Sequence, residues 1–237
     1  MFTNLIQNVA NTPVRPAFFV SLLAIVAMFV SEPSLIAARA AENRWEVEIQ
    51  AFERQDAKRR PPDSAVLFAG SSSIRLWNLE ESFPDLDTIN RGFGGSQLAD
   101  AVHFAERIVI RYRPRLVVLY AGDNDLAAGK KPEQVLADFK QFAAKVKAAL
   151  PETRIAYLAI KPSIKRRALL AQIRETNAAI EQFIAGDNRL TYVDVFHPML
   201  TDDAEPRPEL FRPDGLHLNA EGYQLWASIL QPTLKRH

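Results

Sequence analysis

Two short polar segments contain residue types that can together attack a carbonyl carbon. The first is a run of three serines at positions 71–73, directly after an apolar stretch that ends in glycine. The second reads DGLH (214–217), so that Asp214 precedes His217 by three residues across a glycine. A carboxylate that binds the imidazole Nδ1–H fixes the tautomer and leaves the other ring nitrogen free to deprotonate a hydroxyl. The two segments therefore predict a serine nucleophile activated by an Asp–His pair.

The choice of base rests on the four histidines in the sequence. His237 is the last residue, and His103 falls in the middle of a predicted helix, where a structural role is expected. His197 follows the fifth predicted strand and could approach the site, but we expect it to lack an acidic partner in the residues just before it. His217 has Asp214 at the right spacing, and Asn219 can cap the helix that follows. We therefore predict that His217 is the base.

Donors for a developing oxyanion are expected from two further segments. RGFGGS (91–96) has the spacing G-x-G-G, which differs from the G-x-G-x-x-G of dinucleotide sites. A glycine in this segment would let a backbone N–H approach the reacting carbon closely. GDND (122–125) follows a buried apolar run, and its Asn124 is interpreted either as an amide donor into a cleft or as a turn residue.

The elements that must position these segments are indicated by hydrophobic periodicity. Short apolar runs alternate with longer stretches of helical spacing, and a polar helix closed by two prolines precedes them. Near-continuous apolar strands that alternate with helices predict a parallel sheet covered on both faces, in a single doubly wound α/β domain. Ligands bind outside the carboxyl ends of such strands, where all four polar segments are expected to meet. The predicted strands are 65–69, 86–90, 116–121, 154–160 and 190–195, and the predicted helices are 44–60, 96–112, 133–149, 165–185 and 221–230.

The N-terminal region predicts export. Residues 17–30 form an uncharged apolar run after Arg15, and AARA ends at Ala40, which suits signal peptidase. Fourteen residues are fewer than the ~20 that span a bilayer, so a cleaved signal peptide over 1–40 is favoured over a retained membrane anchor. The protein is then periplasmic or secreted, and the remaining single domain comprises 41–237, with its core at about 62–232.

Composition excludes several classes of function. There is no cysteine, so disulfides, a lipoprotein anchor, thiolate zinc sites and a thiol nucleophile are all ruled out. Residues 1–40 hold two basic residues and one acidic residue, which leaves 29 − 2 = 27 basic and 28 − 1 = 27 acidic residues in 41–237. This balance gives no electrostatic reason to expect a nucleic acid or an anionic membrane as a partner.

Together these segments resemble the SGNH, or GDSL-type, hydrolases, especially their bacterial branch similar to platelet-activating-factor acetylhydrolase. The resemblance covers 65 to about 230. FAGSSSI resembles the block with the nucleophile, NRGFGGS the block with the oxyanion glycine, GDND the Gly-x-Asn-Asp block and DGLH the Asp-x-x-His block. It implies a flavodoxin-like α/β/α sandwich with a five-stranded parallel sheet, and ester hydrolysis without metal or cofactor.

The resemblance also suggests which serine is the nucleophile. Aligning Gly-Asp-Ser with Gly70-Ser71-Ser72 makes Ser72 the nucleophile and puts Ser71 where the family commonly has aspartate. A register shifted by one residue would favour Ser73 instead, but it would sacrifice the glycine that a tight strand-to-helix turn needs. The α/β-hydrolase pattern G-x-S-x-G is not met, because Ile74 stands two residues after Ser72.

The family pattern then implies a complete site. Ser72, Asp214 and His217 form the triad, and the backbone N–H groups of Ser72 and Gly95 join the Asn124 amide in the oxyanion hole. Expected substrates are small-molecule, lipid or glycan esters with short acyl groups, such as lysophospholipids or acetylated glycans. Acyl transfer to a sugar hydroxyl and an inactive carbohydrate-binding domain are the alternatives. The basic segment KPSIKRR (161–167) is interpreted either as a solvated helix start or as a rim that binds a phosphate or acidic sugar.

Overall fold

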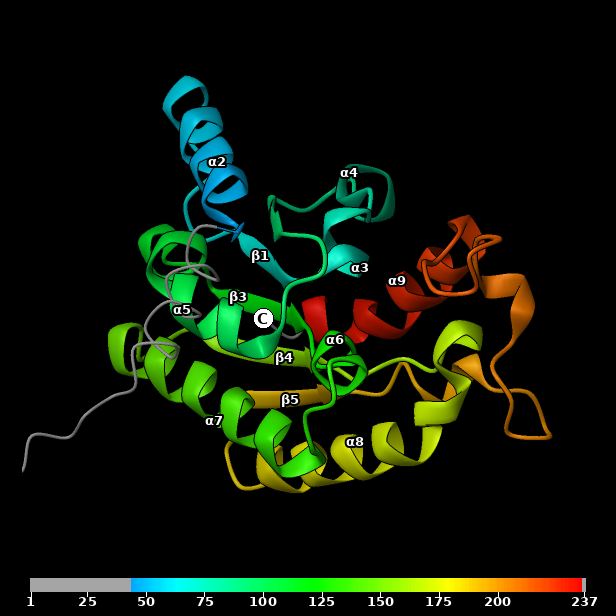
Figure 1. Ribbon diagram of the computed structural model, residues 1–237. Helices are drawn as coiled ribbons and strands as arrows, with labels where there is room; N and C mark the ends of the chain where they lie inside the picture. The colour runs from blue at the N-terminus through cyan, green and yellow to red at the C-terminus, as the bar shows by residue number, and fades with distance from the viewer. Residues whose placement is uncertain (1–43, 236–237) are drawn as a thin grey trace, which may run out of the picture. The chain divides into compact units, whose positions relative to one another are not determined.

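A computed structural model describes residues 44–235, so the predicted signal peptide lies outside the described residues. The described chain is built on a five-stranded sheet with the order β2-β1-β3-β4-β5, in which every pairing is parallel (Figure 1). This confirms the predicted parallel α/β fold. The strands are β1 (Val66–Gly70), β2 (Thr88–Gly92), β3 (Leu116–Tyr120), β4 (Arg154–Leu158) and β5 (Leu190–Val193).

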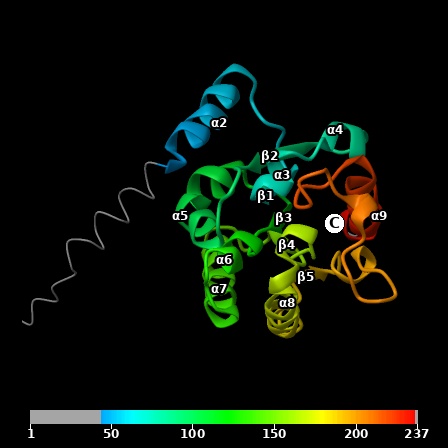
Figure 2. The same cartoon turned by 45° about the vertical axis from the view of Figure 1, so that its right-hand side comes forward.

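Helices cover both faces of this sheet (Figures 1 and 2). α5, α7 and α8 pack side by side on one face, and α9 lies on the other. Within the described part of the chain, no helix is both long and apolar enough to cross a membrane. The α-helices are α2 (Glu46–Lys58), α3 (Ser72–Arg75), α4 (Leu79–Ser82), α5 (Leu98–Ile108), α6 (Asp123–Ala127), α7 (Pro132–Ala149), α8 (Leu170–Ile184) and α9 (Ala220–Lys235). The 3₁₀ helices are η1 (Ile110–Tyr112), η2 (Ile164–Leu169), η3 (His197–Met199) and η4 (Pro208–Leu210).

The predicted elements differ from the observed ones mainly at their ends. β2 starts later than predicted and includes Arg91 and Gly92, because these residues pair with the last two residues of β1. The predicted helix 165–185 is two elements, η2 and α8. The short helices α3, α4 and α6 were not predicted, since four or five residues carry too little periodicity and hold their shape through tertiary contacts.

The strand order creates a crevice between β1 and β3. The chain leaves β1 toward β2 at one edge and then returns to place β3 on the other side of β1. In such sheets the ligand site lies at this switch point, outside the carboxyl ends of the strands. Ser72 follows β1 and Asn124 follows β3, so the two residues stand on either side of the crevice.

The core behind the crevice is apolar and aromatic. All residues of β1 and β3 are buried, as the near-continuous apolar runs predicted. Trp77 stacks on Tyr223 with ring centroids 5.5 Å apart, and Trp226 packs 4.9 Å from Tyr120. The Tyr223 hydroxyl donates a hydrogen bond to the Ser73 carbonyl at 2.9 Å. α9 is thereby attached to the short helix that begins at Ser72.

Gly70 is predicted to be indispensable, because its φ is +134° and a Cβ would lie 1.9 Å from the Tyr120 carbonyl oxygen. Gly129 is a matched control, since its φ is +88° but nothing lies within 4 Å of its Cβ position. We expect Gly129→Ala to cost about 1 kcal/mol of unfolding free energy, from backbone strain alone. Gly70→Ala should cost about 3–5 kcal/mol, because overlap adds to the strain. Urea unfolding measures both, and equal losses would contradict the overlap argument.

Candidate active site

A continuous chain of hydrogen bonds joins Ser72, His217 and Asp214 at the carboxyl end of the sheet. The Oγ of Ser72 lies 3.2 Å from Nε2 of His217, and Nδ1 of His217 lies 2.6 Å from Oδ2 of Asp214. Both side chains of the pair are partly exposed, with exposed fractions of 27% for His217 and 41% for Asp214. The structure thus brings together the three residues predicted to form the triad, with the hydroxyl within hydrogen-bonding reach of the imidazole.

The Asp–His pair is held by a local turn that its own sequence dictates. Oδ1 of Asp214 accepts hydrogen bonds from the backbone N–H groups of Leu216 and His217, both at 2.9 Å. Gly215 adopts a φ of +62°, a conformation that glycine tolerates best. Hydrogen bonds from the His217 ring and from these N–H groups hold the pKa of Asp214 well below its ordinary value. The carboxylate therefore stays ionised at neutral pH and fixes the imidazole orientation.

The segment after β1 exposes only one serine to the imidazole. Ser72 is half-buried at the start of α3, whereas Ser71 and Ser73 are each 1% exposed. The Ser71 hydroxyl, at the position where the family commonly has aspartate, has no hydrogen-bond partner among the described residues. Among the three hydroxyls, that of Ser72 faces His217. This contact agrees with the alignment that places Gly70-Ser71-Ser72 on Gly-Asp-Ser.

The glycine segment and Asn124 are in direct contact. Asn124 lies in the first turn of α6, and its Nδ2 donates a hydrogen bond to the Ser96 carbonyl at 3.0 Å. Gly95, the neighbour of Ser96, has a φ of +77° and is exposed. An amide nitrogen carries two hydrogens, so Asn124 retains a second donor for a ligand. The two predicted oxyanion segments are therefore in direct contact.

A second residue of α6 binds the chain just after the glycine segment. Asp125 is fully buried, and its two carboxylate oxygens lie 3.1 and 3.2 Å from the backbone N of Leu98 at the start of α5. Burial raises the pKa of Asp125, while the ammonium group of Lys130 at 2.9 Å opposes this rise. Asn124 and Asp125 thus bind Ser96 and Leu98, which fixes the place where the glycine segment enters α5. This second function of GDND was not predicted from the sequence.

The basic segment after β4 was interpreted either as a solvated helix start or as a rim, and two of its cations are instead held inside the protein. Lys161 is 2% exposed, and its ammonium group lies 3.2 Å from Asp123 Oδ2 and 3.1 Å from the Tyr120 hydroxyl. Arg166 also binds Asp123, at 2.7 Å, and Arg167 pairs with a surface glutamate. Lys165 and Arg167 are both exposed, and of these two only Lys165 forms no ion pair within 44–235. Two of the four cations, Lys161 and Arg166, therefore share the buried carboxylate of Asp123, and the other two lie at the surface.

A second Asp–His pair corrects the prediction about His197. Asp194 precedes His197 by three residues, and its Oδ2 lies 2.8 Å from Nδ1 of His197. The expectation that His197 has no acidic partner is wrong, and the i, i+3 spacing in the sequence was the signal that could have found it. The His197 side chain is 71% exposed, and the described chain places no serine hydroxyl against its ring. His103 lies within α5, and His237 falls outside the described residues.

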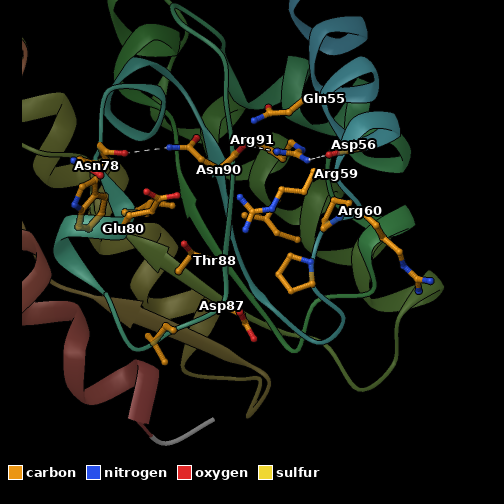
Figure 3. A pocket seen from close by; sticks show the side chains of 16 residues that line it. Gln55, Asp56, Arg59, Arg60, Asn78, Glu80, Asp87, Thr88, Asn90 and Arg91 are labelled. Carbon is orange, nitrogen blue, oxygen red and sulfur yellow. Dashed lines mark hydrogen bonds and ion pairs between the residues drawn. The ribbon is translucent and has the colours of Figure 1, made fainter.

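Figure 3 shows a separate hollow beside the edge strand β2, about 450 Å³ in volume. Its walls come from the end of α2, the start of α4 and residues 86–91. There the buried Arg91 pairs with Asp56 and donates a hydrogen bond to the Tyr112 hydroxyl at 2.9 Å, which fastens α2 to the sheet. None of the predicted site residues lines this hollow. The candidate active site is therefore defined by the hydrogen-bonded side chains and not by the size of a cavity.

Metal ligands form no comparable group. Across residues 44–235, no cluster of three or more histidine, aspartate or glutamate side chains is arranged to hold a metal ion. The chemistry available at the crevice is that of a hydroxyl, an imidazole, a carboxylate and amide donors.

Comparisons with known proteins identify the family of this chain. The chain matches the GDSL-like Lipase/Acylhydrolase family over residues 73–225. Because this match spans more than half of the chain, the protein belongs to that family, whose members are esterases and acylhydrolases. Family membership supports hydrolase activity, and the resemblance inferred from the sequence is confirmed. None of the curated proteins compared with the chain matches it.

Solved structures show the same fold. A Streptococcus pneumonia protein assigned as a platelet activating factor is 23% identical, with a TM-score of 0.73, over 84% of this chain and 99% of its own. A GDSL-like lipase from Bacteroides thetaiotaomicron is 22% identical, with a TM-score of 0.70, over 79% and 97%. A carbohydrate esterase family 3 protein from Talaromyces cellulolyticus is 20% identical, with a TM-score of 0.58, over 72% and 96%. At these identities the likeness concerns the fold.

Proposed function

We propose that this protein is a serine esterase that cleaves carboxylic esters through Ser72, His217 and Asp214. The observation that carries the proposal is the unbroken hydrogen-bonded chain from the Ser72 hydroxyl to the Asp214 carboxylate. His197 has a similar acidic partner but no hydroxyl against its ring in the described residues, so an Asp–His pair alone does not make a site. The Asn124 amide, which contacts the glycine segment at Ser96, supplies the second requirement, a donor for negative charge.

In the first half of the reaction, the Ser72 oxygen attacks the ester carbonyl carbon. Nε2 of His217 takes the hydroxyl proton, and Asp214 stabilises the resulting imidazolium through Nδ1–H. The carbonyl oxygen becomes an oxyanion, which accepts hydrogen bonds from the backbone N–H groups of Ser72 and Gly95 and from Nδ2 of Asn124. The tetrahedral intermediate collapses, the C–O bond to the alcohol breaks, and His217 returns its proton to the departing alkoxide.

The second half repeats this chemistry with water. His217 removes a proton from a water molecule, which attacks the acyl carbon of the Ser72 ester. The same three donors hold the second oxyanion, and each is expected to contribute about 2.7–4 kcal/mol to transition-state stabilisation. Collapse of this intermediate breaks the bond to the Ser72 oxygen, which regains its proton from His217, and releases the carboxylic acid.

Replacing Ser72 or His217 by alanine should abolish hydrolysis of p-nitrophenyl acetate, because each change removes a partner of the proton transfer. The expected loss in kcat is at least about 10³-fold, since triad members act as a unit. Release of p-nitrophenol measures the rate, and circular dichroism checks the fold.

Two matched variants serve as controls for this experiment. His197→Ala removes the second Asp–His pair and should leave kcat within about 2-fold of the parent, because no hydroxyl lies against that ring. Ser73→Ala tests the shifted register and should also retain activity. An inactive Ser73→Ala protein beside an active Ser72→Ala protein would reverse the assignment of the nucleophile.

We further propose short acyl groups, such as acetyl esters of glycans or other small polar alcohols. The only large hydrophobic side chains exposed in 44–235 are Val47 and Ile164, so the described surface offers little support for a long acyl chain. A hollow of about 570 Å³ borders Asp214 and has Ile164, Lys165 and Arg212 among its lining residues. We propose that the two cations, Lys165 and Arg212, bind polar groups on the alcohol part of the ester.

Hydrolysis of p-nitrophenyl esters should fall steeply with acyl length, because a long chain finds no apolar surface to cover it. We expect kcat/KM for the acetyl ester to exceed that for the octanoyl ester by at least about 10-fold, with the Ser72→Ala protein as blank. Free acid must appear without any added alcohol, since an acyltransferase would release little. A preference for octanoyl would contradict the short-acyl proposal.

We also propose that removal of residues 1–40 as a signal peptide delivers the enzyme to the periplasm or outside the cell. The uncharged run at 17–30 and the small residues that end at Ala40 support this proposal.

A further inference from the structure

Arg166 connects the Asn124 amide to a buried group of charges that the proposed reaction does not use. Its Nη2 donates a hydrogen bond to Asn124 Oδ1 at 2.7 Å, and its Nη1 lies 2.7 Å from Asp123 Oδ2. The Arg166 side chain is 15% exposed, and that of Asp123 is 6% exposed. A planar guanidinium can bind two acceptors at once in a fixed geometry, whereas an ammonium group is a single point charge.

The orientation of the Asn124 amide follows from its two partners. Oδ1 accepts from Arg166, and Nδ2 donates to the Ser96 carbonyl at 3.0 Å. If the amide were reversed, its oxygen would face the Ser96 carbonyl oxygen and its NH₂ group would face the guanidinium. Both contacts would then be repulsive. Arg166 therefore selects the one orientation in which Nδ2 faces the glycine segment.

Because Lys161 also pairs with Asp123, Arg166 keeps positive charge with which to polarise the Asn124 amide. Asp123 is shared between Lys161 and Arg166, so two cations face one carboxylate. Burial raises the pKa of Asp123, but the two cations outweigh this effect and hold the pKa below its ordinary value. Nη2 of Arg166, which does not contact Asp123, makes a charge-assisted hydrogen bond to Asn124 Oδ1. This bond polarises the amide and strengthens Nδ2–H as a donor.

The segment that carries Arg166 also contacts the Asp–His turn. The backbone N–H of Lys165 donates to the Gly215 carbonyl at 3.0 Å. A Cβ at Gly215 would lie 3.1 Å from Cβ of Ile164, so the two segments are closely packed. η2 is thus held against the Asp–His turn through Ile164 and Lys165. From the same 3₁₀ helix, Arg166 extends to Asn124.

We infer that Arg166 is a positioning residue, which orients and polarises the Asn124 amide as an oxyanion donor. This inference rests on the proposed esterase function and deepens it. Arg166 does not need to contact the substrate, because its effect passes through Asn124. The basic segment after β4 then has a role that neither a rim nor a solvated helix start would give it.

A double-mutant cycle tests this inference with p-nitrophenyl acetate. Asn124→Ala should lower kcat by about 10²–10³-fold, as expected for loss of one oxyanion donor. Arg166→Met should lower kcat by about 10- to 100-fold with KM changed by less than about 3-fold, because the donor remains but is misplaced. In the Asn124→Ala background, Arg166→Met should lower kcat by less than about 2-fold further.

Two variants separate positioning from stability. Arg167→Met removes a cation from the same 3₁₀ helix, where Arg167 pairs with exposed Glu205, and should leave kcat unchanged. Arg166→Lys keeps a charge beside Asp123 but cannot bind both acceptors, so it should fold with a parent-like Tm and still lose kcat. It carries the test if Arg166→Met does not fold. Equal losses from Arg166→Met in both backgrounds, or a folded Arg166→Lys protein with parent-like kcat, would overturn the inference.

Crystal structures give a readout that does not depend on turnover. In the Arg166→Lys structure, we expect the Asn124 amide to rotate away from the Ser96 carbonyl or to occupy two orientations. An unchanged Nδ2-to-carbonyl distance of 3.0 Å would overturn the inference even if the wild-type protein hydrolysed no ester. Failure of the proposed function would instead appear as an inactive wild type, whichever orientation the amide adopts.

Discussion

The hydrogen bond between Ser72 Oγ and His217 Nε2 joins two residues 145 positions apart, and the whole site depends on it. Neither residue can reach the other unless β1 ends at a tight turn and the Asp–His turn folds back over the same edge of the sheet. Gly70 permits the first, since a side chain there would overlap the Tyr120 carbonyl. α9 secures the tight turn, because the Tyr223 hydroxyl binds the carbonyl of Ser73, the residue next to Ser72. The packing around Gly70 and Tyr223 thus determines the distance between the Ser72 hydroxyl and the His217 ring.

Buried charge forms the second layer of the site. Asp123 and Asp125 flank Asn124 in sequence and bind different partners, namely Lys161 and Arg166 in one case and Leu98 and Lys130 in the other. Ion pairs taken out of water contribute little net stability, because desolvation offsets their attraction. We infer that their value here is geometric, because the Arg166 that pairs with Asp123 also holds the Asn124 amide in one orientation. In the proposed reaction, an amide held in this way needs no reorganisation as charge develops on the substrate.

Much of this arrangement could be predicted from local sequence. Apolar runs identified all five strands, because a parallel sheet covered on both faces needs little else. The Asp214–His217 pair was predictable because three residues of chain determine its geometry. The same reasoning applies to Asp194 and His197, whose partnership the sequence argument missed despite identical spacing. What distinguishes the two pairs is a serine hydroxyl, and only the fold brings one to His217.

Contacts between segments far apart in the sequence could not be predicted from it. Lys161 and Arg166 read as surface cations because their acidic partner, Asp123, lies about forty residues earlier and meets them only through the β3–β4 pairing. The short helices α3 and α6 were missed for the same reason, since their tertiary neighbours hold them. The position of Gly70 favoured Ser72 over Ser73. Which hydroxyl faces the imidazole, however, depends on where the fold places the distant turn 214–217.

Active-site labelling with a fluorophosphonate, followed by peptide mass spectrometry, tests the central claim most directly. Such a reagent phosphonylates only a serine whose hydroxyl is activated by a neighbouring base. The account predicts one adduct per chain, located on Ser72, and no adduct in the His217→Ala protein. An adduct on Ser73, or an unmodified protein under conditions that label a known serine esterase, would contradict it.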